Sequence, residues 1–400
     1  MTLAGVALFH HHTLYVALAG LAAITLYKLG LGDFGGVAGV AGLIALLRHE
    51  WVTLANLLGL LLGFALLADH FERSGLPTLL PRWLPDDWKG GFMLLVIVFV
   101  ISSFLDNIAA AMIGGAMAHV LFKGRVHIGY LAGIVAASNA GGSGSVVGDT
   151  TTTMMWIAGV PPSEVFEAYI ASVVAIAIFG VVAAKQQHAL QPIMKDDPVD
   201  AFFEAPRLAI VAVILVTALA ANVAFNVKAP EVLDEWPVIG IAVWVAILAT
   251  APWRTPGWGL LPGALKGSIF LLSLVMCAAM MPVKALPDPS WQAAFGLGFV
   301  SAVFDNIPLT ALALHQGGYD WGFLAYAVGF GGSMIWFGSS AGVALSNMYP
   351  EAKSVGAWLR AGWHVALAYV AGFFVLLAVH GWHVDVPSTR MTPPPAKTTP

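Results

Sequence analysis

Residues 137–156 read ASNAGGSGSVVGDTTTTMMW. Glycines, hydroxyl side chains and one carboxylate thus gather in a chain that is 59% hydrophobic and only 10% charged. A break of this kind inside an apolar helix exposes N–H and C=O groups, and each unpaired group costs several kcal/mol in hydrocarbon. Such a break therefore persists only where it lines a water-filled cavity or binds something. The stretch predicts a membrane-spanning helix that is unwound at a functional site.

The rest of the composition agrees with a membrane location. Mean hydropathy is +0.83, whereas soluble domains are about half apolar and a quarter charged. Apolar segments long enough to span about 30 Å of hydrocarbon recur along all 400 residues, which leaves no room for a sizeable soluble domain. The expected crossings are 13–30, 34–47, 51–68, 127–159, 163–184, 207–226, 236–252, 266–283, 321–348 and 356–379. We therefore expect an all-α membrane protein.

Two further apolar stretches, 91–122 and 291–316, are interrupted at Asp106-Asn107 and Asp305-Asn306. Their arms are too short to span singly, which predicts re-entrant helical hairpins. Residues 68–91 mix charges with Leu, Trp and Pro, as an interfacial segment does. The tail, 387–400, is rich in Pro and Thr and is expected to be disordered. His10, His11 and His12 are interpreted as an interfacial flank rather than a metal site.

The chain also repeats itself. SSFLDNIAAA from Ser102 corresponds to SAVFDNIPLT from Ser301, and GGSGSVVGDT from Gly141 corresponds to GGSMIWFGSS from Gly331. Both pairs occur in the same order, so we divide the chain into 1–195 and 205–380. Each half then holds five crossings, one hairpin (91–122 or 291–316) and one unwound helix (127–159 or 321–348). An odd number of crossings per half inverts the second half relative to the first, which predicts an inverted repeat.

The distribution of Lys and Arg orients this topology, because positive loops are retained in the cytoplasm. Thirteen fall on one side and five on the other. Both termini are accordingly predicted to be non-cytoplasmic, in a membrane of the bacterial inner-membrane type.

Oxygen-bearing groups cluster at the breaks. Oxygen ligands of this kind suit hard cations such as Na⁺, and carboxylates at membrane depth are functional-site candidates by default. No Lys or Arg lies within the breaks to neutralise them. The candidate site residues are Asp106, Asn107, Gly142, Ser143, Asp149 and Thr150 in the first half, and Asp305, Asn306, Gly332, Ser333, Ser339 and Ser340 in the second. The glycines are expected to supply conformational freedom, so that the unwound links offer carbonyls to the cation.

At these residues the sequence resembles a known family. LDNI and FDNIP at the hairpin tips, with SNAGGSGSVVGDTTTTMMWIAG after the first, are similar to the NhaD-type sodium/proton antiporters. That branch belongs to the ion transporter superfamily, which includes citrate, dicarboxylate and arsenite carriers. The resemblance covers both halves.

The resemblance implies two hairpins and two unwound helices in an inverted repeat, with a transport domain that slides against a scaffold, usually in a homodimer. It implies cation ligands at Asp106, Asn107, Asp149, Asp305 and Asn306. This chain is short for the branch and carries Ser339-Ser340 where its first half has Asp149-Thr150.

We expect a secondary active transporter that exchanges Na⁺ or Li⁺ for H⁺. The alternative is a cation-coupled carrier of a small anion such as citrate, dicarboxylate or arsenite, in which half-helix N-termini hold the anion. Three buried acids and no buried base favour cations. An intramembrane aspartyl enzyme is a third possibility, but it would leave the glycine-rich links without a role. A channel is disfavoured, because an internal repeat with two hairpins is the geometry of a carrier. The single cysteine, Cys277, has no disulfide partner. No resident cofactor and no nucleic-acid partner are expected; the ligands are transported ions and the surrounding lipid.

Overall fold

The computed structural model describes residues 13–79, 83–194, 203–281, 287–304 and 306–384. The predicted tail and His10–His12 lie outside this part of the chain. The first half contains α2 (Thr13–Leu31), α3 (Gly39–Arg73), α4 (Leu76–Leu79), α5 (Trp88–Ser102), α6 (Asn107–Leu121), α7 (Ile128–Ser143), α8 (Thr150–Ile157), α9 (Pro162–Phe166) and α10 (Ala168–Leu190). The second contains α11 (Ala205–Lys228), α12 (Pro230–Glu235), α13 (Val238–Thr250), α14 (Leu261–Ala279), α15 (Trp291–Ser301), α16 (Asn306–Gln316), α17 (Trp321–Gly331), α18 (Ser340–Met348), α19 (Val355–Ala361) and α20 (Trp363–Val379).

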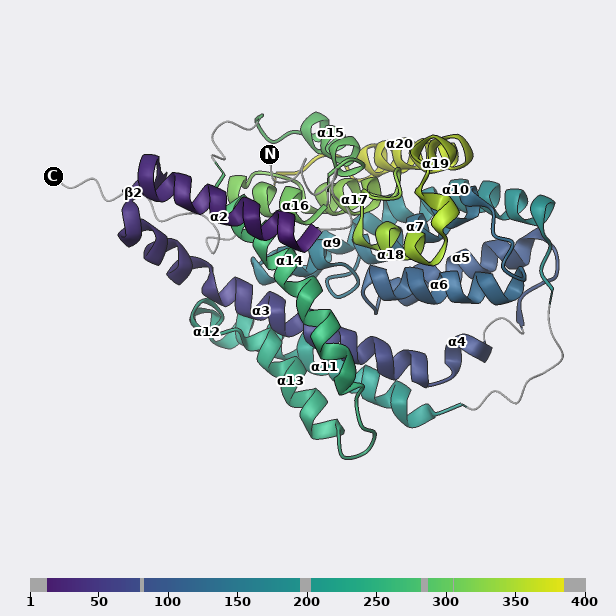
Figure 1. The fold of residues 1–400 in the computed structure, drawn as a ribbon, viewed down its shortest axis with the longest axis horizontal. Coiled ribbons are helices and arrows are strands. Elements are labelled where there is room, and N and C mark those ends of the chain that lie inside the picture. The colour runs from purple at the N-terminus through teal and green to yellow at the C-terminus, as the bar shows by residue number, and fades with distance from the viewer. Residues whose placement is uncertain (1–12, 80–82, 195–202, 282–286, 305, 385–400) are drawn as a thin grey trace.

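The four interruptions expected from the sequence all separate helices. α5 ends at Ser102 and α6 begins at Asn107, while α7 ends at Ser143 and α8 begins at Thr150. The arms α5 and α6 have 15 residues each, about 22 Å of helix, which is shorter than the hydrocarbon core. They pack side by side, as Figure 1 shows. Within the described residues, five helices are long and apolar enough to cross a membrane, or six if the bent pair α19–α20 is one span. The protein is an all-α membrane protein in its overall architecture.

One expected loop is absent. The segments 34–47 and 51–68 were predicted as two crossings, yet α3 runs through Arg48-His49-Glu50 as one helix of 35 residues. Glu50 is buried, and its carboxylate lies 3.9 Å from the His315 ring on α16. The buried member of the charged triplet thus has a partner on a distant helix, whereas Arg48 and His49 are exposed. The two predicted crossings are thus one helix, so the expected number of crossings falls from ten to nine. The prediction that both termini lie on the same side of the membrane required an even number of crossings.

The start of the same segment is not helical. Residues Asp33–Phe34 (β1) and Val37–Ala38 (β2) form a two-stranded antiparallel ribbon, a small departure from an all-helical chain. Gly35 and Gly36 at its turn have φ of 65° and 93°, values that glycine adopts at little cost and that suit a tight hairpin. Asp33 Oδ1 accepts a hydrogen bond from Gly36 N at 2.8 Å.

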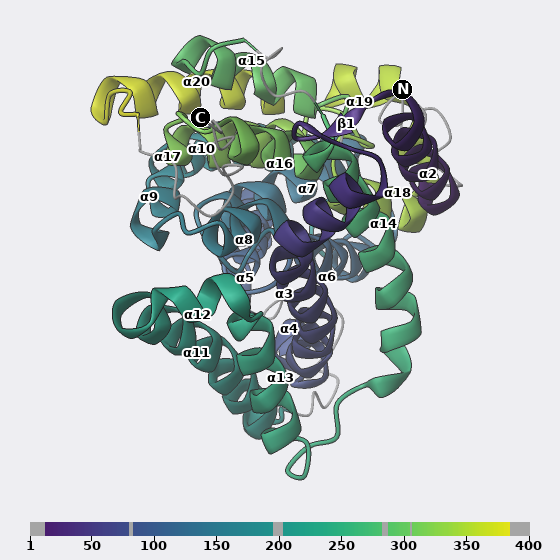
Figure 2. The same ribbon diagram turned by 90° about the vertical axis from the view of Figure 1, so that its left-hand side faces the viewer.

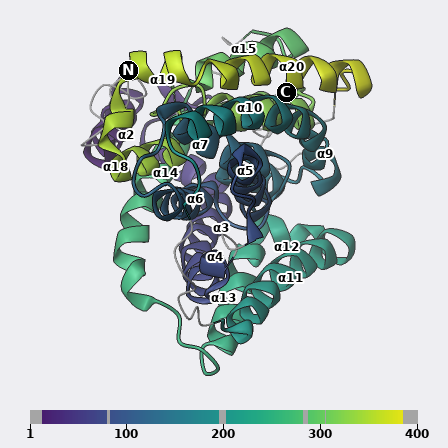
Figure 3. The same ribbon diagram turned by 90° about the vertical axis from the view of Figure 1, so that its right-hand side faces the viewer.

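The helices form two layers. α11 and α13 pack against each other and against α3, and α14 packs against α2, α3 and α16. In Figure 2, α11, α13 and the start of α14 lie in the lower part, below α10, α17 and α20, with α3 in the centre and α2 at the upper right. Figure 3 shows the same division from the opposite side. Between the halves, α6 packs against α18 and α16 packs against α8, so each hairpin touches the broken helix of the other half.

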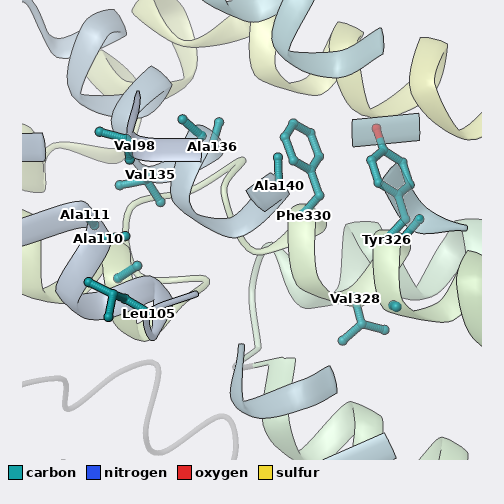
Figure 4. Close-up of a cluster of buried hydrophobic side chains, with 14 of the residues drawn as sticks. Val98, Leu105, Ala110, Ala111, Val135, Ala136, Ala140, Tyr326, Val328 and Phe330 are labelled. Carbon is teal, nitrogen blue, oxygen red and sulfur yellow. The ribbon is translucent and has the colours of Figure 1, made fainter. Parts of the chain in front are cut away.

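The upper layer is held by small and aromatic side chains. In Figure 4, Val98 of α5 and Ala111 of α6 lie near Val135 and Ala136 of α7, where small side chains let the helices approach closely. Farther along, Tyr326 and Phe330 of α17 stack in parallel, with ring centroids 5.4 Å apart. The broken helices α7 and α17 also contact each other, so both belong to this layer.

Candidate cation site

The tip of the first hairpin is bonded to the broken link of α7 and α8. Asp106 caps α6, its carboxylate accepting a hydrogen bond from Ile108 N at 3.2 Å. The Ser102 hydroxyl donates to Ser138 O at 2.6 Å, and the Ser145 hydroxyl donates to Ser103 O at 2.6 Å. Because these bonds pair backbone carbonyls near the two breaks, they fix the tip against the link.

Asp149 occupies the start of α8 and is almost fully buried. Its Oδ2 accepts from the Thr151 hydroxyl at 2.8 Å, and its Oδ1 accepts from Asn107 Nδ2 at 3.2 Å. The Thr152 hydroxyl donates to Ser145 O and the Thr153 hydroxyl to Val146 O. Part of the link's backbone is thus satisfied by threonines of the same helix. The carbonyls of Ser145 and Val146 are therefore paired within the protein, and the supply of carbonyls to a cation stays a prediction for the other residues of the link.

Asn139 joins the two halves of the chain at this point. Its Oδ1 accepts from Asn107 Nδ2 at 3.0 Å, while its Nδ2 lies 2.9 Å from Ser333 Oγ and 3.1 Å from Ser339 Oγ. Its side chain is completely buried in α7. A continuous polar network therefore runs from Asp149 through Asn107 and Asn139 to the link of α17 and α18.

The second half supplies neutral polar groups to this network. Ser339 caps α18 by accepting a hydrogen bond from Gly342 N at 3.3 Å. Asn306 begins α16 and is buried, and in the described part of the chain its Nδ2 has no hydrogen-bond partner. A buried amide of this kind has unused binding capacity. Asp305, predicted as a ligand, lies outside the described residues.

A cavity of about 290 Å³ opens beside the first-half residues. Asp106, Asp149, Thr150 and Thr153 line it on one side. Apolar and small residues of α3 and α14 line the other, among them Leu60, Phe64, Gly267 and Ser268. No Lys, Arg or His is among its lining residues. The cavity therefore places two acidic groups at the boundary between the two layers, with no basic side chain among the described residues that line it.

The glycines of the links act differently from our expectation. They were expected to provide unusual φ angles, but Gly144 has φ of −97° and Gly332 of −58°, and neither they nor their neighbours in the described links have positive φ. They are needed because backbone lies close by. A Cβ on Gly142 would lie 2.7 Å from Gly148 O, and one on Gly332 would lie 2.7 Å from Gly338 O. Gly142 O itself accepts from Ser145 N at 3.0 Å.

Comparison with known proteins gives the chain relatives over most of its length. No protein-family model matches it. Sodium/proton antiporter 1 of Arabidopsis thaliana is 28% identical over 82% of this chain and 60% of its own length. Na⁺/H⁺ antiporter NhaD of Vibrio parahaemolyticus is 27% identical over 75% of this chain and 84% of its own. Na⁺/H⁺ antiporter NhaD of Alkalimonas amylolytica is 24% identical over 84% of this chain and 79% of its own.

The chain is thus similar to proteins named sodium/proton antiporter and Na⁺/H⁺ antiporter NhaD. It spans about 60% of the length of the Arabidopsis protein. These relatives are transporters by name, which argues indirectly against an enzyme.

In this chain the predicted residues do not all face the same way. Asp106, Asn107, Asp149 and Thr150 gather at the cavity or its network, joined by Ser333 and Ser339. Ser143 turns away, since its hydroxyl bonds Ala140 O and Ser172 Oγ, each at 2.9 Å. Ser340 is half-buried at the first position of α18.

Asn139 and Thr151 were not among the predicted site residues. Asn139 stands two residues before Gly141-Gly142-Ser143, a polar amide in an apolar helix. An amide in an apolar helix could have identified Asn139 as a site residue, since polar residues are rare at membrane depth and tend to be functional. Thr151 was one of four consecutive threonines, and the sequence did not show which of them faces Asp149.

Proposed function

We propose that this chain is a secondary active antiporter that exchanges Na⁺ or Li⁺ for H⁺ by alternating access. The observation that carries the proposal is the cavity at Asp106 and Asp149, where two carboxylates meet hydroxyl and amide groups without a basic neighbour among the lining residues. The names of its relatives support the same exchange. Small inorganic ions are its cargo, and the coupling ion is substrate rather than resident cofactor.

Exchange follows from the chemistry of the two cavity carboxylates, Asp149, which is buried, and Asp106, which is half-buried. A bare carboxylate in a low-dielectric site is unfavourable unless it is paired or neutralised. Asp149 and Asp106 therefore hold either a proton or a metal cation, and one cargo displaces the other. Asn107 and Thr151 keep Asp149 in place in either state, since both donate to its oxygens. Competition for one pair of carboxylates couples the two fluxes.

An inverted repeat with two re-entrant hairpins supports alternating access in this proposal. Ser102 Oγ donates to Ser138 O, and Ser301 Oγ donates to Val328 O at 2.7 Å. These paired bonds have the spacing of the sequence repeat, as do the close backbone approaches at Gly142 and Gly332. Five segments lie between the hairpins, namely α7–α8, α9–α10, α11, α13 and α14. If each segment crosses the membrane once, the odd number of crossings makes the two hairpins enter the membrane from opposite sides.

We place the protein in a membrane of the bacterial inner-membrane type, as a homodimer in which the upper layer slides against the lower one. With α3 as a single crossing, the charge bias that keeps Lys123 and Arg125 cytoplasmic puts the N-terminus in the cytoplasm and the C-terminus outside. This replaces the arrangement with both termini outside. A reporter active only in the cytosol tests it when fused to either end.

The anion-carrier alternative is not favoured. The curated relatives are named for sodium and protons, and an anion beside Asp106 and Asp149 would be repelled unless bound cations screened both.

Transport by purified protein in proteoliposomes with an internal pH dye tests the proposal. Na⁺, Li⁺, K⁺, citrate, succinate and arsenite are added in turn. We expect Na⁺ or Li⁺ to drive proton release from the vesicles, and Asp106→Asn and Asp149→Asn to abolish it. Asp87→Asn is the matched control, because Asp87 also caps a helix but lies at the exposed start of α5. Full exchange in both site variants would contradict the proposal, and sodium-dependent anion uptake without proton movement would support the alternative.

A further inference from the structure

Three side chains with metal-binding chemistry meet away from the cation site. They are Asp320, directly before α17, and His380 and His383, directly after α20. One carboxylate oxygen of Asp320 and one ring nitrogen of each histidine all lie within 4.8 Å of one another. The two imidazole rings have centroids 5.0 Å apart. Three potential ligands therefore converge from segments about 60 residues apart in the sequence.

Local backbone structure brings His383 to this place. Gly381 has φ of +78°, which ends α20 in the left-handed conformation that glycine favours. Trp382 then packs edge-on against Phe323 of α17, with centroids 5.3 Å apart. His383 N donates to Asp320 Oδ2 at 3.0 Å. The turn after α20 is thus held against the start of α17.

Asp320 and His380 have further partners that suit a metal site. Asp320 Oδ1 accepts from Phe323 N at 3.2 Å as the cap of α17. A carboxylate has about four acceptor positions, so two N–H bonds are compatible with a metal bond. His380 Nε2 lies 2.9 Å from Glu167 Oε2. A carboxylate on one ring nitrogen is the usual means of orienting a metal-bound histidine.

We propose that Asp320, His380 and His383 bind one divalent transition-metal ion of the Zn²⁺ type, with Glu167 orienting His380. Two imidazoles and a carboxylate suit Zn²⁺ and its neighbours, whereas Na⁺, Mg²⁺ and Ca²⁺ select oxygen-only sites. Bonds of about 2.0–2.1 Å in tetrahedral geometry put ligand atoms about 3.3 Å apart. The side chains must therefore close in on the ion. His383 is exposed, so its ring is free to do this and the ion reaches it from solvent.

The bound ion would join three elements of the upper layer. It would tie Asp320, the N-cap of α17, to the turn after α20, and through Glu167 to the start of α10. α17 leads into the link that holds Ser333. The site is chemically separate from the proposed Na⁺ site, because it is built from imidazoles and does not share a residue with the network around Asp149.

Calorimetric titration of the purified full-length protein with Zn²⁺, after removal of bound metal, tests the proposal. The background variant has His10, His11 and His12 replaced by alanine, because those histidines could bind metal themselves. We expect one ion per chain in that background, with binding at least tenfold weaker in His380→Ala and His383→Ala. Glu167→Gln is expected to weaken binding about tenfold or more. His188→Ala, a histidine of α10 outside the cluster, is the control and should bind normally.

Two further readouts separate a metal site from a structural ion pair. Co²⁺ should give visible d–d absorption in the background variant and not in His383→Ala. At one Zn²⁺ concentration, the unfolding temperature should rise more in the background variant than in His383→Ala. Because the His383 side chain is exposed, this variant is expected to fold. Equal Zn²⁺ binding in the background variant and in His380→Ala and His383→Ala would overturn the proposal, as would no binding in the background at all.

Discussion

Replacing Asn139 by alanine removes three hydrogen bonds, two of which join the two halves of the chain. They run from Asn107 Nδ2 at 3.0 Å and to Ser333 Oγ and Ser339 Oγ at 2.9 and 3.1 Å. Side-chain hydrogen bonds in membrane proteins contribute about 0.6 kcal/mol each on average, so about 2 kcal/mol of stability is at stake. Asn107 also loses the partner that helps orient it towards Asp149. If about 0.6–1 kcal/mol of the interaction between Asn107 and Asp149 is lost, the affinity of the site for Na⁺ falls about three- to fivefold.

The assay combines unfolding of the detergent-solubilised protein with the Na⁺ concentration dependence of proton release from proteoliposomes. Ser138→Ala is the matched control, because Ser138 is the buried neighbour of Asn139 and its hydroxyl donates to Val135 O of its own helix. Asn139→Ala should be the less stable of the two and require more Na⁺ for half-maximal exchange. If both variants showed the same stability and the same Na⁺ dependence, the network would be packing without a role in the site.

Three other substitutions test separate parts of the structure. Asp149→Asn should keep the helix cap, since Asn caps as well as Asp, yet lose exchange in the pH-dye assay. Gly142→Ala should destabilise the protein and slow transport because its Cβ would meet the backbone at 2.7 Å, whereas Gly296→Ala meets open space and should do neither. At the start of α11, the hydrogen bond from Arg254 lowers the pKa of Glu204 below its usual 4.5. The stabilisation of the folded state by ionised Glu204 is present above pH 4.5 and is lost as pH falls through the lowered pKa. Glu204→Gln should therefore unfold more easily than the native protein at pH 7, but not at strongly acidic pH.

The helix breaks could be predicted because their signal is local. Asp106-Asn107 and the run from Gly141 to Thr153 are polar within apolar sequence, and no uninterrupted membrane helix tolerates that cheaply. The continuity of α3 could not be predicted, since Glu50 finds His315 across 265 residues of sequence. The partners of Asn139 were hidden for the same reason, lying 194 and 200 residues away.

The role of the glycines was predicted for the wrong physical reason. The sequence shows that a link is glycine-rich, but it does not show why. Glycine is needed either where φ is positive or where neighbouring atoms leave no space for a Cβ. Gly142 and Gly148 are close-packed: a Cβ on Gly148 would meet Ser102 O of the hairpin. Only the folded contacts of the tip with the link reveal this requirement.

The unequal halves lead to a last expectation about the number of ions bound. Asp149 of the first link corresponds to Ser339 of the second, and Asn139 corresponds to Gly329. A serine cap brings no charge to offset the dehydration of a cation, whereas Asp149 does. We therefore expect one saturable Na⁺ site per chain, at the first link, with Ser333 and Ser339 supporting it through Asn139. Equilibrium binding of ²²Na⁺ should show one site in the native protein and none in Asp149→Asn. A saturable site that survives in this variant would show that the second link binds a cation by itself.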